Sequence, residues 1–142
     1  MSTGTVKSRI RVILDTNIIV SAIGFRGKPR SILQKVLDKQ IRSYSSSVLL
    51  AELEDVINKK FPDLTDNFER FNRQVRKKIK IVKPSKSLHI VKDEDDNRVL
   101  EAAVEAKCDY IVTGDKVLLG LGNFKEIKIV TADQFLRLVE EN

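Results

Sequence analysis

The chain has 142 residues, of which 42% are hydrophobic and 32% are charged, and its formal net charge is +6. This length suits one domain with a core of its own, and no apolar run approaches the ~20 residues of a membrane helix, which excludes a membrane protein. Met1–Thr5 lack the apolar stretch of a secretory signal, and Cys108 is the only cysteine. We therefore expect a cytoplasmic protein without internal disulfides.

Strand and helix patterns alternate along the chain. Residues 1–8 have the composition of a flexible polar tail, and residues 9–142 are expected to form a single domain. The candidate strands, in chain order, are Ile10–Leu14, Arg42–Ser45, Ile79–Val82, Tyr110–Val112 and Ile127–Val130. Helical spacing of apolar residues lies between them: after Pro29, from Ser46 or Ser47 to about Lys60, at Phe68–Val75, at Val99–Ala106, and after Thr131. The alternation predicts a three-layer α/β/α sandwich with a central parallel sheet of about five strands.

Two aspartates follow predicted strands. Asp15 comes directly after Ile10–Leu14, and Asp115 comes three residues after Tyr110–Val112, behind Thr113 and a glycine. Ligand sites of open parallel sheets lie at the carboxyl ends of the strands, so these two carboxylates are candidates for one site. Taken singly, each has an ordinary structural explanation as a turn residue or a helix cap.

The helix predicted after Ser46 carries a further candidate acid. Glu52 has Leu49 and Val56 one turn away, and an acid on an apolar stripe is costly to bury unless it is paired. Glu54 is flanked in the same way by Leu50 and Ile57. Helical spacing alone does not decide between the two glutamates.

An acidic run, Asp93–Asp96, precedes the helix that contains Val99 and Ala103. Acids favour helix N-termini, where the helix dipole and free N–H groups stabilise negative charge. Four consecutive acids exceed what a cap requires, so at least one is expected to face inward with Leu100.

Several carboxylates in one cleft repel each other unless a cation binds between them, and such oxygen ligands suit Mg²⁺ or Mn²⁺. A divalent ion of this kind activates water and stabilises charge that develops on a phosphate. His89 is the only histidine, which excludes an acid–base ribonuclease that uses two histidines.

At these positions the chain resembles the PIN-domain nucleases. The matching segments, in order, are Ile13–Asn17, Ser47–Leu53, Asp93–Ala103, Val112–Lys116 and Ile129–Leu136. Each segment is a weak signal alone, but the four acidic motifs occur in order and in matching structural contexts, and the match extends over nearly everything from residue 10 to 140. The resemblance is greatest to the single-domain prokaryotic branch, which is VapC-like and includes many toxins of toxin–antitoxin pairs.

The resemblance implies a metal-dependent endoribonuclease that uses Mg²⁺ or Mn²⁺ and leaves 3′-hydroxyl and 5′-phosphate ends. It also implies a homodimer and a cognate antitoxin as partner. It favours Glu52 over Glu54 and selects Asp96 from the acidic run. The implied catalytic and metal-binding acids are Asp15, Glu52, Asp96 and Asp115, with Asn17 and Thr113 as supporting polar residues.

Two positions depart from the family pattern. Glu94 stands where a proline is common, a change expected to matter little. Many relatives carry another acid two residues beyond the last aspartate of the site, and this chain has Val117 there. The departure leaves open whether one metal ion or two are bound. Val117 also supports an alternative hypothesis, in which the protein is a PIN module that binds RNA or a partner protein and has weakened or lost catalysis. A third hypothesis, a phosphatase or phosphoacceptor domain with Asp15 as nucleophile, is opposed by Asn17, because such phosphatases place a second aspartate there.

Two basic segments are candidates for binding RNA phosphates. Arg70, Arg73 and Lys77 repeat at helical spacing and are expected to share one face of a helix. A loop downstream of Asp15 contains Arg26, Lys28 and Arg30, and we expect it to border the acidic cleft. A basic surface that serves only solubility is the alternative for both segments, as it is for the net charge of the chain.

Overall fold

The computed structural model of the chain describes residues 9–140, so the predicted tail, residues 1–8, lies outside the described residues. A six-stranded sheet with strand order β3-β2-β1-β4-β6-β5 forms the centre of the fold. The strands are β1 (Arg11–Leu14), β2 (Arg42–Ser45), β3 (Ile79–Ile81), β4 (Tyr110–Val112), β5 (Asn123–Phe124) and β6 (Ile127–Val130).

All five strands predicted from the sequence are present, and they pair in parallel. The register places Ile13 of β1 between Tyr44 of β2 and Ile111 of β4. The sixth strand, β5, was not predicted: it is only two residues long and pairs antiparallel with β6 at the edge of the sheet. Two residues carry too little pattern to be recognised as a strand.

Seven α-helices and two short 3₁₀ segments connect the strands in the described part of the chain. The helices are α1 (Thr16–Gly24), α2 (Lys28–Leu37), α3 (Ser47–Lys60), α4 (Thr65–Gln74), α5 (Glu94–Glu105), α6 (Lys116–Leu121) and α7 (Ala132–Glu140). The 3₁₀ segments are η2 (Pro62–Leu64) and η3 (Arg76–Lys78).

Helices α1 and α6 were not predicted. Helix α1 buries Ile18, Ile19, Val20 and Ile23 on several sides, so its sequence is apolar nearly all round and lacks the alternation of an amphipathic helix. Helix α6 has six residues, which is too short for helical spacing to be read from it.

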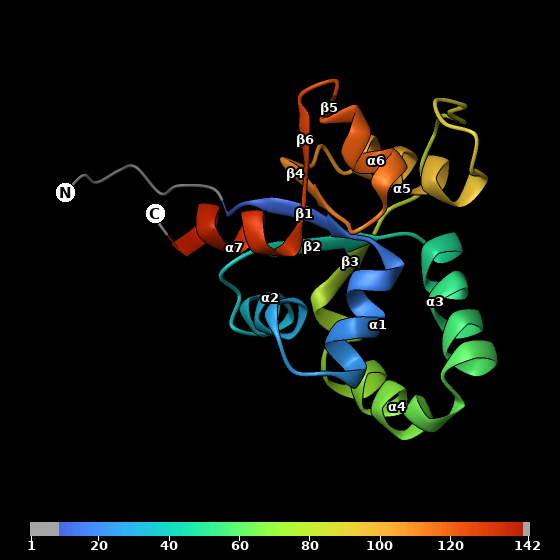
Figure 1. Cartoon of the computed structure of the whole chain (residues 1–142), viewed down its shortest axis with the longest axis vertical. Helices are drawn as coiled ribbons and strands as arrows, with labels where there is room; N and C mark the ends of the chain where they lie inside the picture. The colour runs from blue at the N-terminus through green and yellow to red at the C-terminus, as the bar shows by residue number, and fades with distance from the viewer. Residues whose placement is uncertain (1–8, 141–142) are drawn as a thin grey trace.

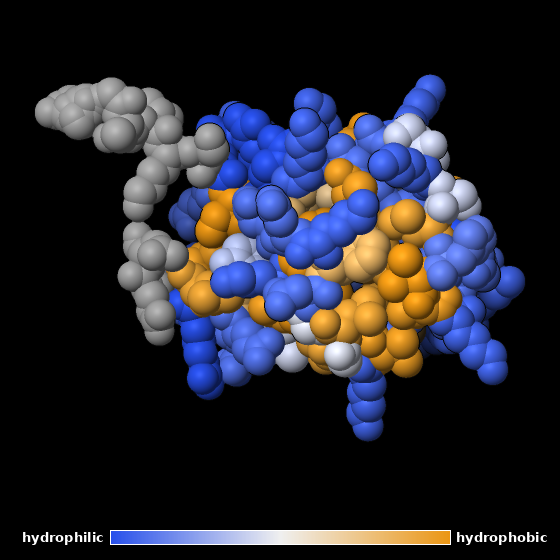
Figure 2. All heavy atoms as spheres, turned by 90° about the horizontal axis from the view of Figure 1, so that it is seen from above, coloured by the Kyte–Doolittle hydropathy of each residue, from blue (hydrophilic) through white to orange (hydrophobic). Residues whose placement is uncertain are grey.

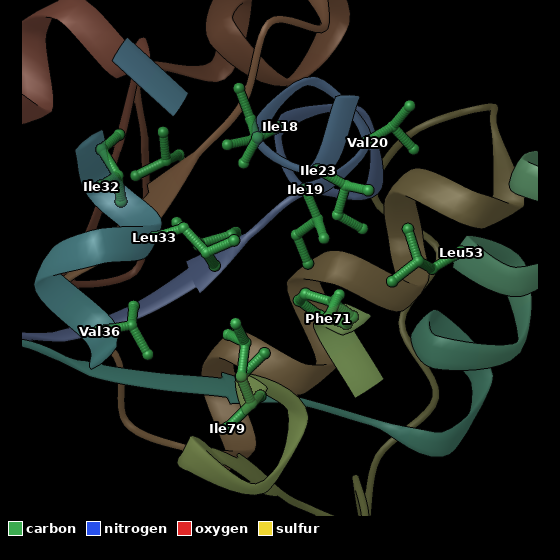
Figure 3. Packing of buried hydrophobic residues seen from close by; sticks show 14 of the residues in the cluster. Ile18, Ile19, Val20, Ile23, Ile32, Leu33, Val36, Leu53, Phe71 and Ile79 are labelled. Atoms are coloured by element: carbon green, nitrogen blue, oxygen red, sulfur yellow. The ribbon is translucent and has the colours of Figure 1, made fainter. Parts of the chain in front are cut away.

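Helices cover both faces of the sheet, as the three-layer prediction required. In Figure 1, α5 and α6 lie above the sheet, and α1, α2 and α4 lie below it. Alternation along β1 directs Val12 and Leu14 into the core with α1, α2 and α4, and Ile13 into the core with α5. Figure 3 shows the first of these cores, in which Ile19 and Ile23 of α1 approach Phe71 of α4.

This topology places the candidate site. Because β1, β2 and β4 are parallel neighbours, the residues that follow them meet at one edge of the sheet. Asp15 follows β1 at this edge, and Thr113 follows β4. Among the helices between residues 9 and 140, none combines the length and the apolar composition needed to cross a membrane.

Candidate metal centre

An acidic cleft of about 240 Å³ opens at the carboxyl edge of the sheet. Side chains from the starts of α1, α5 and α6 and from one face of α3 meet there. The lining residues are Asp15, Thr16, Asn17, Glu52, Val56, Lys60, Asp93, Asp95, Asp96 and Asp115. The four acids implied by the family resemblance are therefore neighbours in space, although Asp15 and Asp115 are 100 positions apart in the sequence.

Asp15 lies at the floor of the cleft, between β1 and α1. Its side chain is 7% exposed and is fixed on both sides, since Oδ1 accepts the backbone N–H of Thr16 at 2.8 Å and Oδ2 accepts the Thr113 hydroxyl at 2.6 Å. The same carboxylate is the N-cap of α1, where the helix dipole stabilises negative charge. Thr113, buried at the end of β4, thus orients Asp15 across two neighbouring strands.

Asp115 is held in the same manner at the start of α6. Its Oδ2 accepts the backbone N–H of Leu118 at 3.0 Å, which makes it the N-cap of the helix. Its own backbone N–H donates to the Thr113 hydroxyl oxygen at 3.0 Å. Asp115 is therefore both a helix cap and a residue of the cleft, since one of its carboxylate oxygens caps α6 while the residue lines the cleft.

Helix α3 directs one of its two candidate glutamates into the cleft. Glu52 is half-buried, and the Thr16 hydroxyl donates a hydrogen bond to its Oε1. Glu54 is exposed and does not line the cleft. The rotation of α3 against α1 and α5 decides between them, since α3 packs between these helices.

The acidic run divides its members between capping and the cleft. Asp93 is the N-cap of α5 and accepts the backbone N–H of Asp95 at 2.8 Å. Asp96 is the buried aspartate of the run, as the expectation of one inward-facing acid required. Asn97, fully buried, accepts backbone N–H groups of Ile90 and Val91 at 3.0 Å, and so ties the preceding loop to α5.

Burial and neighbouring carboxyl groups raise the pKa values of three acids in the cleft. The pKa of Glu52 is raised to about 7, chiefly by burial, with hydrogen bonding to Asp95 and the charges of Asp95 and Asp15 as further causes and the Thr16 hydrogen bond opposing them. Burial also raises the pKa of Asp96 to about 7, with hydrogen bonding to Asp115 and the charges of Asp115 and Asp93 as additional causes. Burial raises the pKa of Asp15, against the opposing hydrogen bonds from Thr113 and Thr16. Three carboxyl groups in one cleft therefore gain protons more readily than usual.

The donor chemistry of the cleft fits a hard divalent cation. A cation between the carboxylates would offset the repulsion that raises these pKa values, and carboxylate oxygens are the ligands that Mg²⁺ and Mn²⁺ prefer. Within residues 9–140, however, no group of three or more acidic, histidine or cysteine side chains already has its donor atoms arranged to hold an ion. Hydrogen bonding between carboxyls, Glu52 with Asp95 and Asp96 with Asp115, turns their oxygens toward each other.

Sequence reasoning missed four polar residues of the lining. Thr16, Asp93 and Asp95 are direct neighbours of predicted site residues, so proximity along the chain was the available signal. Lys60, eight residues after Glu52 on α3, is the basic side chain in the lining. It lies two turns further along the helix, and this i, i+8 relation to Glu52 was its signal.

The predicted RNA-binding loop lies away from the cleft. Helix α1 begins at Thr16, directly after Asp15, and carries the chain away from the cleft over nine residues, roughly 13 Å. The expectation that Arg26, Lys28 and Arg30 border the acidic cleft is therefore wrong. Lys28 forms an ion pair with Asp133 of α7 at 2.6 Å, and Arg30 donates to two carbonyls at the end of α1.

The second basic segment is divided between two places. Helix α4 ends at Gln74, so Arg70 and Arg73 belong to it while Lys77 lies in η3. The expectation of one helical face for all three is wrong, because the chain tightens into a 3₁₀ turn to enter β3. Arg70 lines a groove between α2 and α4, and Lys77 lines a basic pocket at the opposite edge of the sheet from the cleft. Contact of these residues with RNA stays a prediction.

The mostly parallel sheet between two layers of helices, with an acidic cleft at its carboxyl edge, places the protein in the class of α/β/α folds whose sites lie at the ends of the strands. The match to a family model narrows this class: residues 11–117 match the PIN domain. The chain belongs to the PIN-domain family, whose members are generally nucleases.

Relatives and solved structures agree with this assignment. An uncharacterized protein of Methanocaldococcus jannaschii, MJ1680, is 28% identical over 154 aligned positions, which cover 95% of each chain. The fold is similar to that in the crystal structure of VapBC2 from Rickettsia felis bound to a DNA fragment from their promoter, with a TM-score of 0.60, 18% identity, and 84% of this chain and 97% of that chain covered. It is also similar to the PIN domain of T. brucei RRP44, with a TM-score of 0.54, 15% identity, and coverage of 94% and 81%. At these identities the two structures support the fold alone.

Proposed function

We propose that the protein is an endoribonuclease that depends on Mg²⁺ or Mn²⁺. The single observation that carries the proposal is the convergence of Asp15, Glu52, Asp96 and Asp115 on one cleft in a PIN-domain chain. A divalent ion, when bound, supplies the charge that activates water and stabilises a phosphate in the transition state.

The side chains of this chain have separable roles in the proposal. Asp15, with its two fixed oxygens, is preorganised for an ion, because Thr113 and the Thr16 N–H hold it in one rotamer. Glu52 and Asp96 complete the negative site when they release their protons. Lys60 lies at the cleft, where its ammonium group suits an RNA phosphate next to the cleaved bond. Asn17 is exposed at the cleft and offers an amide to the substrate or to a ligand water.

The decisive experiment incubates the purified protein with mixed RNA and Mn²⁺, with and without EDTA, and maps the ends of the products. We expect cleavage that EDTA abolishes, with 3′-hydroxyl and 5′-phosphate ends. Titration of Mn²⁺ by calorimetry tests the site separately and reports whether one ion or two bind. RNA affinity without Mn²⁺ binding or cleavage would reject the nuclease and favour a PIN module that only binds RNA.

We further propose that the nuclease is the toxin of a toxin–antitoxin pair, acting in the cytoplasm. The family resemblance and the fold shared with VapBC2 support this role. Two exposed apolar side chains on helices that carry site acids suit contact with a partner protein: Val48 lies one turn before Glu52 on α3 and is 56% exposed, and Val117 lies two residues after Asp115 and is 53% exposed. In Figure 2, apolar atoms gather in the middle of the face seen from above and polar side chains surround them.

Induced expression in a bacterial host tests the toxin role. We expect growth arrest with the natural chain and normal growth with Asp15→Asn. Normal growth with both chains, while cleavage persists in vitro, would reject the toxin role and keep the nuclease. Homodimerisation, which the family resemblance implies, is tested by light scattering on the purified protein.

A further inference from the structure

A second charged site lies at the amino edge of the sheet, away from the acidic cleft. It is a cavity of about 440 Å³, formed where the chain enters β1, β2 and β3. Its basic lining residues are Arg9, Lys39, Arg42, Lys77, Lys78 and Lys80, and no carboxylate is among the described residues that line it. Because β1 runs from one site to the other, roughly 20 Å of extended chain separates Arg9 from Asp15.

The cations of this basic pocket are left unneutralised by the fold. None of the six makes an ion pair or a side-chain hydrogen bond with another residue between 9 and 140. Among the lysines and arginines between residues 9 and 140, only Lys28, Lys59, Arg98 and Arg137 form an ion pair, so the pocket is distinguished by the gathering of six unpaired cations in one place. Like charges brought together without counter-charges repel each other, and an anion between them relieves that repulsion.

A buried hydroxyl in the lining points to a ligand independently of the charge. Ser43 of β2 is 2% exposed, and its Oγ has no hydrogen-bond partner among the described residues. Buried polar groups are nearly always hydrogen-bonded, so an unpartnered one calls for a bound water or a ligand oxygen. Ser43 shares the pocket with Arg42 and Lys78, and an anion seated there would meet both charge and a hydroxyl.

We propose that the basic pocket binds a backbone phosphate of RNA, so that the protein holds its substrate at a point remote from the cleft. A single-stranded RNA is the polyanion of choice because the proposed function makes RNA the substrate, and the inference rests on that function to this extent. Phosphate contacts give affinity without reading sequence. Long RNA would therefore engage both edges of the sheet, and a short oligonucleotide would engage the cleft alone.

Binding in EDTA tests the pocket without cleavage. The variant Lys78→Glu/Lys80→Glu reverses two exposed charges in the pocket, and Lys86→Glu/Lys125→Glu makes the same change in net charge at exposed positions outside every cavity described here. Fluorescence anisotropy with labelled RNAs of about 6 and about 30 nucleotides, over a range of salt, measures affinity. We expect the pocket variant to lose at least about tenfold in affinity for the long RNA and to reduce the salt slope by about two. The control variant and the short RNA are expected to change much less.

Ser43→Ala is a second variant that keeps every charge. The Ser43 hydroxyl has no hydrogen-bond partner among the described residues, so its removal should not lower the thermal stability of the protein. We expect this variant to lose about threefold in affinity for the long RNA. This variant decides the matter if the double charge reversal fails to fold. Equal losses in the pocket and control variants, or unchanged affinity for the long RNA, would overturn the proposal. Because EDTA suppresses cleavage, an inactive protein that binds long RNA through this pocket would reject the nuclease and retain the inference.

Discussion

The two ends of one parallel sheet carry opposite charge in this protein. At the carboxyl end, six acids and one lysine line a cleft. At the amino end, six cations line a pocket without a carboxylate among the described residues. The net charge of +6 therefore does not predict where charged sites lie, because the fold gathers six acids at one edge of the sheet and six cations at the other.

The two ends also differ in how their charges are held. In the cleft, Asp15 and Asp115 accept backbone and hydroxyl hydrogen bonds at helix N-termini, so their positions are fixed before any ligand arrives. In the basic pocket, Lys78 and Lys80 have exposed side chains without such partners. Acids held in fixed positions suit catalysis, which requires fixed geometry, and exposed lysines without fixed partners suit attraction of a polyanion.

The largest expected effect is the loss of cleavage in Asp15→Asn. The amide keeps the size of the side chain and an acceptor for Thr113, but it removes the charge that a metal ion requires. We expect cleavage of RNA to fall at least about 100-fold, since even outer-sphere changes cost 10–100-fold at metal sites. RNA affinity in EDTA should persist, because the basic pocket is untouched. Asp38→Asn, at an exposed position outside the cleft, is the control, and full cleavage by Asp15→Asn would reject its role as a ligand.

A second prediction concerns Thr113, which orients the acid without being a ligand in the proposal. Thr113→Val preserves shape and removes the hydroxyl that donates to Asp15 and accepts from the Asp115 N–H. We expect Mn²⁺ affinity to fall about tenfold, measured by titration calorimetry. Thr113→Ser restores the hydroxyl and should restore the affinity. A loss of affinity in both variants would indicate a packing role for the threonine instead.

The third prediction uses the raised pKa values of Glu52 and Asp96, both about 7. Between their ordinary values, 4.5 and 3.8, and about 7, the folded protein binds more protons at these groups than the unfolded chain does. Their contribution to stability is therefore largest below the ordinary values and declines as pH rises toward 7. Thermal unfolding of the metal-free protein should show this decline, and Asp96→Asn should flatten it.

A fourth prediction repeats the thermal unfolding measurements with Mn²⁺ present. Because a cation needs ionised carboxylates, Mn²⁺ should raise the unfolding temperature more at about pH 8 than at about pH 5. Glu54→Gln, which changes an exposed glutamate outside the cleft, should leave both the pH profile and the Mn²⁺ response unaltered. A Mn²⁺ effect independent of pH would argue against these carboxyls as the binding groups.

The smallest expected effect comes from Lys60, the cation at the otherwise acidic end. Lys60→Ala should raise KM for RNA by about threefold and leave kcat close to its natural value, since a phosphate contact binds substrate and transition state alike. Lys59→Ala is a matched neighbour, because Lys59 is turned toward Asp55 and does not line the cleft. A fall in kcat with unchanged KM would instead place Lys60 at the reacting phosphate.

The strands were the most predictable part of the fold. Each of β1 and β4 contains a short apolar run that is typical of a strand buried on both faces, and β2, β3 and β6 continue the alternation of strands with helices. Helix α1 was not predicted because it is buried on several sides and therefore lacks an amphipathic pattern. Strand β5 was not predicted because two residues are too few to show any pattern. Helical spacing of apolar residues reveals a helix only where one side of that helix meets water.

Some residues of the candidate site could be predicted from local sequence, and others depended on how the helices pack. The position of Asp15 and Asp115 after strands followed from local sequence, because parallel strands deliver their carboxyl ends to a common edge. The choice between Glu52 and Glu54 did not, since both have apolar neighbours on their helix. The rotation of α3 against its neighbours, a property of packing, turns one of them into the cleft.

The amino-acid sequence by itself determined the alternation of strands and helices, the sheet that follows from it, and the acids at the strand ends, because hydrophobic periodicity and turn chemistry are local properties. The family resemblance selected the four acids Asp15, Glu52, Asp96 and Asp115, and the tertiary structure brings them into one cleft. Only the tertiary structure decided that the loop with Lys28 lies away from this cleft and that Arg42, Lys78 and Lys80 gather at the opposite edge. These outcomes depend on residues from separate segments being brought together, and no single segment carries that information.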